Sequence, residues 1–190
     1  LDTVSIWRPF LHEALDFAKK WSQMEAHYWE SIPDVFRSTA LVDKFEGDAE
    51  GWNVVSGTWG VSSGKYRQTD TANTNTNSWR AVQQQNMMIF EWNATFNSIT
   101  RMGGMHFFAS DCTDAGGNRG NSYLVWQDND TIKIYEGAGT SLYLRATFSY
   151  GALQGETHYY KVAYDPSNGG IYVYRDEEYI GKWIDTTPLT

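Results

Sequence analysis

Apolar and polar residues alternate along most of this chain, which is the pattern of half-buried β-strands. From residue 42 onward, short alternating runs recur every 8–12 residues or so (about the spacing of an all-β domain), separated by Gly-, Asn-, Asp- and Ser-rich turns. These runs predict twelve strands: Trp52–Val55, Gly57–Val61, Lys65–Gln68, Ser78–Val82, Met88–Phe96, Met105–Ala109, Ser122–Trp126, Thr131–Tyr135, Leu142–Phe148, His158–Tyr164, Ile171–Tyr174 and Tyr179–Ile184. No helical period interrupts them, so the pattern predicts two stacked antiparallel sheets, an all-β sandwich.

The first 41 residues follow a different pattern. Leu1–Trp7 alternates and predicts a short strand. After Pro9, apolar residues recur every three or four positions, which predicts one long α-helix from Phe10 to about Ile32, ended by Pro33. Aromatic side chains widen the apolar stripe of this helix, so it needs the sandwich, another copy or another domain to pack against. We therefore expect two regions: residues 1–41 as an extension with a strand and a helix, and residues 42–190 as the sandwich.

Composition narrows the possible partners. The chain has 9 Trp, 12 Tyr and 9 Phe, which suits an aromatic-rich β protein, and its formal net charge is −8. This charge disfavours nucleic acid and anionic membranes as partners, because nothing would offset phosphate repulsion. The single Cys excludes an internal disulfide framework. No apolar run approaches the roughly 20 residues needed to cross a bilayer, and the start at Leu1 leads us to expect a processed or excised chain.

Seven segments carry a family likeness: Phe45–Trp52, Gly57–Val61, Gly64–Tyr66, Met105–Ser110, Asn118–Trp126, His158–Val162 and Ile171–Asp176. Together they resemble strands of concanavalin A-like, laminin-G-like jelly-roll domains of bacterial or archaeal surface proteins. The resemblance implies a jelly-roll sandwich and an extracellular or cell-surface location. It implies no single function, because this fold hosts lectins, glycosidases, adhesion modules and inert spacers.

The resemblance also implies a closing strand. In such domains a further strand or two follows the last hairpin, whereas this sequence ends at Thr190. Leu1–Trp7 is similar to that last strand, and three explanations stay open: it closes its own sandwich, it enters the sheet of a neighbouring copy, or it belonged to a preceding domain. Donation to a neighbour would produce a homo-polymer, with the predicted assembly residues Leu1, Val4, Ile6, Trp7, Trp21, Tyr28 and Trp29.

Catalytic residues are not apparent in the sequence. Glycosidases need two carboxylates flanking the sugar bond, which on a strand would occupy alternate positions. The acidic cluster in the β region, Asp176–Glu178, falls instead on a predicted hairpin tip. The four histidines lack a Gly-x-Ser-x-Gly nucleophile motif, so we expect a protein that is not an enzyme.

Calcium is the metal that the resemblance implies, since these jelly rolls frequently hold a structural calcium where the first and last strands meet. Its oxygen donors here would be Asp2, Glu46 and a backbone carbonyl near Gly64. The alternative is that Glu46 and Asp48 cap a turn.

A sugar site combines a flat aromatic ring with planar hydrogen-bonding groups. The residues with this chemistry near the Asp111–Asn121 loop and the central strands are Trp126, Tyr123, Arg119, Asn121, His106, Trp79 and Arg80. The alternative is that these aromatics fill the core and that Arg80 and Arg119 form structural ion pairs. Asn93 and Asn129 match the N-glycosylation sequon.

Two functions from different classes fit these observations. One is a structural, self-assembling subunit of an extracellular filament or sheath, joined by strand donation. The other is a non-catalytic carbohydrate-binding, adhesive module of a larger secreted protein. The unmatched strand and the aromatic helix favour the first for this chain, while the second describes the usual role of the fold.

Overall fold

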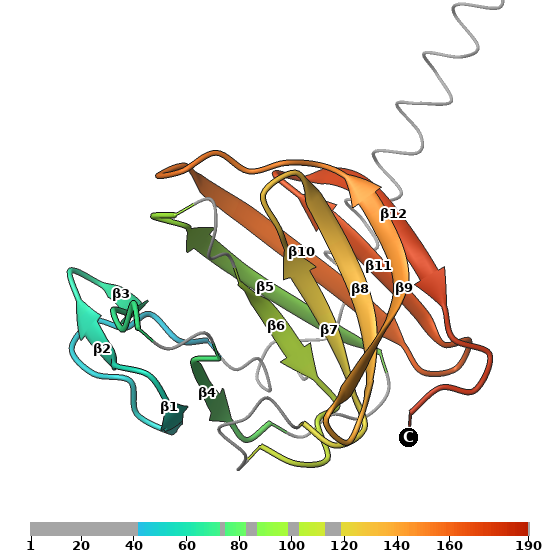
Figure 1. The fold of residues 1–190 in the computed structure, drawn as a ribbon, viewed down its shortest axis with the longest axis horizontal. Helices are drawn as coiled ribbons and strands as arrows, with labels where there is room; N and C mark the ends of the chain where they lie inside the picture. The colour runs from blue at the N-terminus through green and yellow to red at the C-terminus, as the bar shows by residue number, and fades with distance from the viewer. Residues whose placement is uncertain (1–41, 73–74, 83–86, 99–102, 113–118, 190) are drawn as a thin grey trace, which may run out of the picture. The chain divides into compact units, whose positions relative to one another are not determined.

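Two four-stranded antiparallel sheets form the centre of the fold (Figure 1). The computed structural model describes residues 42–72, 75–82, 87–98, 103–112 and 119–189. Its strands are β1 Trp52–Ser56, β2 Trp59–Ser62, β3 Lys65–Gln68, β4 Asn77–Arg80, β5 Met88–Thr95, β6 Gly104–Phe107, β7 Ser122–Gln127, β8 Thr131–Ala138, β9 Ser141–Ser149, β10 Thr157–Asp165, β11 Gly170–Arg175 and β12 Glu178–Ile184. One sheet has the order β12-β11-β10-β5 and is called the β10 sheet below. The other, β6-β7-β8-β9, is called the β8 sheet, and two small sheets pair β1 with β4 and β2 with β3.

The predicted all-β sandwich is confirmed, and each of the twelve predicted strands overlaps an observed one. The largest extension is in β8, which runs to Ala138 because a bulge after Ile134 lets Glu136 and Gly137 keep pairing with β9. No helix occurs among the described residues. The strand and long helix predicted for residues 1–41 lie outside the described part of the chain.

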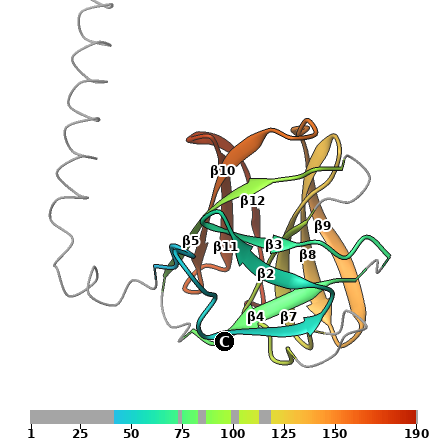
Figure 2. The same cartoon turned by 90° about the vertical axis from the view of Figure 1, so that its left-hand side faces the viewer.

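The core lies between the two large sheets, which face each other in Figure 2. Alternation along each strand sends every second side chain inward. The fully buried members of this core are Phe107, Tyr123, Val125, Ile132 and Ile134 from the β8 sheet and Tyr160, Val162, Tyr164, Ile171 and Val173 from the β10 sheet. Outward-facing residues that are not themselves covered are therefore the ones available to a ligand; Leu124 on β7 faces outward but is only 5% exposed.

Close packing joins the two sheets at the β9–β12 edge. A bulge in β12 lies opposite Val173 and Tyr174, and a Cβ on Gly181 would lie 2.2 Å from the Phe148 ring of β9. Glycine at this position leaves the room that the aromatic ring fills. The bulge and the glycine together let the edge strands approach each other.

The β11–β12 hairpin turns at Asp176 and Glu177, as the sequence predicts for this acidic cluster. Both residues have positive φ, 52° and 68°, a combination that suits a two-residue hairpin turn but favours glycine or asparagine. The acidic cluster Asp176–Glu178 therefore lies on an exposed hairpin turn.

Candidate functional site

The outward face of the β8 sheet presents two rows of side chains across its four strands. The register places Gly104, Trp126, Lys133 and Thr147 in one row, and His106, Leu124, Tyr135 and Leu144 in the next. Their neighbours Val125, Ile132 and Ile134 are core residues, so strand alternation directs both rows away from the core. We call this surface the Trp126 face.

Gly104 makes Trp126 accessible from one side. A Cβ on Gly104 would lie 2.0 Å from the carbonyl oxygen of Val125, so no other residue fits here without a backbone shift. The partner of Trp126 on β6 therefore has no side chain to cover the indole ring. Trp126 is half-buried, which leaves part of its ring exposed beside this gap.

A charged pair lies on the other side of Trp126. Lys133, its partner on β8, forms an ion pair with Asp128 with an Nζ–Oδ2 distance of 2.5 Å. Lys133 and the Asn129 amide lower the pKa of the Asp128 carboxyl, and Asp128 raises the pKa of Lys133. An aromatic ring beside an ammonium, a carboxylate and the Thr147 hydroxyl is the combination that a sugar can stack on and hydrogen-bond to.

His106 and Arg119 lie at the β6–β7 end of this face. Burial and the nearby Arg119 guanidinium lower the pKa of His106 to about 4, so the ring is neutral at pH 7. The Nδ1 atom of His106 is buried without a hydrogen-bond partner, and Arg119 is 8% exposed. Both side chains are therefore largely covered and offer little surface to a ligand.

The other sugar-site candidates are dispersed. Tyr123 is 0% exposed and points into the core, where its hydroxyl donates to Asp185 Oδ2 at 2.7 Å. It is therefore a structural residue that no ligand can contact. Asn121 is exposed at the stem of the β6–β7 loop, where its carbonyl accepts from the Ser110 amide at 3.0 Å. Trp79 and Arg80 are on β4, in the small sheet that pairs with β1.

Sequence reasoning missed Lys133, Asp128 and Tyr135 as companions of Trp126. The sequence did contain part of the information. The Asp128–Asp130 turn joins two consecutive strands, and side chains along each strand point alternately toward the core and toward solvent. The register that puts Lys133 directly opposite Trp126 was the missing information.

Some of the predicted metal-binding and glycosylation residues lie on the surface, and others lie outside the described residues. Glu46 is exposed in a bend before β1, and Gly64 is exposed in the β2–β3 turn with a φ of 67°. Asp2 and all seven predicted assembly residues lie outside the described residues, so calcium and strand donation stay predictions. Within residues 42–189, and leaving aside their undescribed gaps, no group of three or more His, Cys, Asp or Glu side chains is placed to bind a metal. Asn93 on β5 and Asn129 in the β7–β8 turn are both exposed.

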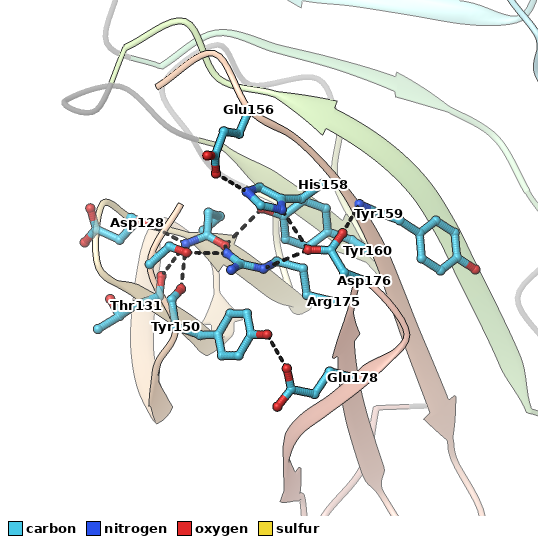
Figure 3. A network of polar contacts seen from close by, with 12 residues as sticks. Asp128, Thr131, Tyr150, Glu156, His158, Tyr159, Tyr160, Arg175, Asp176 and Glu178 are labelled. Carbon is cyan, nitrogen blue, oxygen red and sulfur yellow. Dashed lines mark hydrogen bonds and ion pairs between the residues drawn. The ribbon is translucent and has the colours of Figure 1, made fainter. Parts of the chain in front are cut away.

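A polar network centred on the buried side chains of Arg175 and Gln127 links the two large sheets (Figure 3). Arg175, 6% exposed, donates to Gln127 Oε1 at 3.2 Å and to the Gly151 carbonyl at 2.6 Å, and lies 4.0 Å from the centre of the Tyr150 ring. Tyr160 donates to the same Gln127 oxygen at 3.0 Å, and burial raises the pKa of Tyr160 to about 12. These contacts link the β10 and β8 sheets, and each polar partner has a structural role.

His158 extends the network to the surface, as Figure 3 shows. Its Nδ1 lies 2.7 Å from Asp176 Oδ2 and its Nε2 lies 3.2 Å from Glu156 Oε2. Although burial raises the pKa of the Asp176 carboxyl, the Tyr159 amide, His158 and Arg175 together lower it below its usual value. His158 thus ties the β9–β10 loop to the β11–β12 turn, and no nucleophile is in contact with it among the described residues.

Beneath the Trp126 face, the described residues line a small hollow between the sheets. Its volume is about 10 Å³, enough for about one water molecule, and Trp92, Gly104, Val125 and Gln127 are among its walls. It cannot hold a sugar. The exposed face is therefore the better candidate for a ligand surface.

Comparisons with known proteins agree with this architecture. No protein-family model and no curated protein matches the chain. Among solved structures, the chain is similar to the carbohydrate-binding module CBM66 from Bacillus subtilis, with a TM-score of 0.58 and 17% sequence identity. The similarity covers 72% of this chain and 80% of that module, and at this identity it shows a common β-sandwich fold. In the part of the chain that is described, no helix is long and apolar enough to cross a membrane.

Proposed function

We propose that this protein is a non-catalytic carbohydrate-binding module whose ligand lies on the Trp126 face. One observation carries the proposal: a half-exposed indole lies between a glycine without a side chain and the Lys133–Asp128 ion pair. This arrangement provides a stacking surface with a donor and an acceptor beside it. The fold likeness to a carbohydrate-binding module supports it.

The proposal includes the finer assignments made from the sequence. They are the jelly-roll strand order of the concanavalin A-like, laminin-G-like domains, an extracellular or cell-surface location, a parent chain of larger size, and a structural calcium bound by Asp2, Glu46 and a backbone carbonyl near Gly64. The self-assembling subunit favoured by the sequence has no support among the described residues. Carbohydrate binding therefore replaces it as the main function.

A binding screen with matched variants tests the proposal. The probes are four neutral soluble polysaccharides, xylan, laminarin, amylose and inulin, measured by affinity electrophoresis and Trp fluorescence. We expect at least one to bind, and Trp126→Ala to weaken that binding about tenfold or more, as expected when a stacked aromatic is removed.

The matched control is Tyr143→Ala, which removes an aromatic side chain that is 50% exposed on β9 but is not in either row of the Trp126 face. This variant should bind like the parent protein. Equal binding by the parent and Trp126→Ala, or no binding to any of the four probes, would refute the proposal.

A further inference from the structure

The outward face of the β10 sheet is lined with tyrosines. The register places Tyr179, Tyr174, Lys161 and Glu91 in one row across β12, β11, β10 and β5, and Lys182, Tyr172, Ala163 and Ile89 in a second row. Their neighbours Val162, Ile171 and Val173 are in the core, so both rows face away from it. We call the surface formed by Tyr172, Tyr174, Tyr179, Lys161 and Lys182 the tyrosine face; its strands lie side by side in Figure 1.

Two rings of this face form an angled pair. The centroids of Tyr174 and Tyr179 are 5.4 Å apart, their planes are inclined by 56°, and Tyr179 is 50% exposed. Because the rings are not coplanar, they cannot lie flat against a crystalline polysaccharide surface. They can hold a single chain, whose sugars would advance by roughly one strand spacing each, about 5 Å.

Lysines place positive charge beside these rings. Lys161 Nζ lies 5.3 Å from the centre of the Tyr174 ring, and Lys182 Nζ lies 5.8 Å from that of Tyr172. Among the described residues, Lys182 forms no ion pair and its ammonium group lies against the Tyr172 ring. Such an ammonium can pair with an anionic group on a ligand stacked at the tyrosines.

The carboxylates of this sheet lie at its β5 side, where Glu91 is the direct cross-strand neighbour of Lys161. Glu91 accepts a hydrogen bond from the Tyr159 hydroxyl. Burial, Glu91 and Glu177 raise the pKa of Tyr159, which locates both carboxylates near that ring. The row that contains Lys182 and Tyr172 includes no acidic residue. The charge of the face is therefore locally positive at the Lys182 end, although the whole chain has a net charge of −8.

A second copy of the chain does not fit this surface. Lysines lie over two of the three rings, and the centres of protein–protein interfaces are depleted in lysine. Glycans, in contrast, combine apolar C–H faces for stacking with oxygens that accept from ammonium groups.

We propose that the tyrosine face binds a single polysaccharide chain that carries carboxylates, that is, a polymer of uronic acids. Tyr174 and Tyr179 stack on the sugar rings, and Lys182, assisted by Lys161, pairs with the carboxylates. This inference rests on the proposed function as a carbohydrate-binding module and adds a second surface with a different ligand class. Because the Trp126 face and the tyrosine face lie on opposite outer sides of the sandwich, one module would join two glycan chains.

Polygalacturonate and its fully methyl-esterified form test the proposal, since they share a backbone and differ in charge. Binding is measured by isothermal calorimetry on the full chain, with a chelator present so that no cation bridges carboxylates. We expect the acid to bind at least about tenfold more tightly than the ester, and Lys182→Gln to remove about that factor while Lys182→Arg retains it. Tyr179→Ala should weaken binding of both polymers.

The matched control is Lys65→Gln, which removes an exposed lysine of β3 that belongs to neither face and should leave polygalacturonate binding unchanged. Lys182 is exposed, so its variants should fold, and far-UV circular dichroism checks this. Equal affinity for acid and ester, no binding of polygalacturonate, or unchanged binding by Lys182→Gln would overturn the inference. Binding of the four neutral polysaccharides at Trp126 is measured in a separate experiment. A negative result with polygalacturonate would therefore leave the proposed function intact.

Discussion

His106 should make the stability of this protein depend on pH between about 4 and 6.5. The folded protein keeps this imidazole neutral, since burial and Arg119 lower its pKa from 6.5 to about 4. Between these two pH values the unfolded chain binds a proton at His106 and the folded chain does not. The free energy of unfolding contributed by this residue is therefore fully present above pH 6.5 and is lost as pH falls toward 4.

The size of the effect follows from the same two values. The difference between 6.5 and about 4, at about 1.4 kcal/mol for each factor of ten in proton affinity, corresponds to a loss of about 3 kcal/mol. This is a large fraction of the roughly 5–15 kcal/mol by which domains are usually stable. Removing the imidazole should therefore make the free energy of unfolding measurably less dependent on pH.

His106→Leu is the informative variant. It removes the titrating ring together with the buried Nδ1 atom that has no hydrogen-bond partner, so its stability at pH 7 should equal or slightly exceed that of the parent. Urea unfolding, followed by far-UV circular dichroism at pH 7, 5.5 and 4.5, gives the free energy of unfolding of both proteins. The parent should lose about 2 kcal/mol or more relative to the variant by pH 4.5.

The difference in the free energy of unfolding between the parent and His106→Leu isolates the contribution of His106, because every other titrating group is present in both proteins. Equal losses of stability in His106→Leu and the parent between pH 7 and pH 4.5 would show that His106 does not cause the pH dependence.

Four further predictions follow from single contacts, each measured by urea unfolding at pH 7. Gly104→Ala should cost about 2 kcal/mol or more, because its Cβ would meet the Val125 carbonyl oxygen at 2.0 Å; an unchanged midpoint would contradict this. Arg175→Met should cost about 2–4 kcal/mol, since the Gly151 carbonyl loses its donor, the Gln127 oxygen keeps only Tyr160, and the contact with the Tyr150 ring is lost; Arg175→Lys should recover little of it. Tyr123→Phe should cost about 1–3 kcal/mol by removing the donor to the buried Asp185 carboxylate, a loss that a surface Tyr143→Phe should not show. Glu177→Gly should stabilise the fold by about 1 kcal/mol because it relieves a φ of 68°, and a lower stability would argue against that turn geometry.

Much of the fold was predictable because each strand contains its own local signals. The Ser63-Gly64 and Asp176–Glu178 turns were located from residue type alone, since positive φ and side-chain capping are properties of a few residues. Strand ends were less certain. The continuation of β8 to Ala138 depends on a bulge opposite β9, which is a property of two paired strands rather than of one.

The candidate site was only partly predictable. Trp126 could be selected as an aromatic residue near a polar loop, but Tyr123, three residues before it, has the same chemistry and lies in the core. Alternation predicts that the two residues face opposite sides of the strand without saying which side is the core. The companions Lys133 and Asp128 needed the register of β7 with β8, and the tyrosine face needed the register of β10, β11 and β12.

The sequence by itself determined the strands, the turns and the all-β class of the described sandwich, because period-two alternation and turn-forming residues act within a few positions of the chain. It also determined the supply of aromatic and charged groups from which a glycan surface can be built. The tertiary structure alone decided which rings are buried, which lie beside a lysine, and which share a face. Those properties arise from pairing between strands that are distant in sequence, and a shift of one residue in the register would exchange the core face for the solvent face.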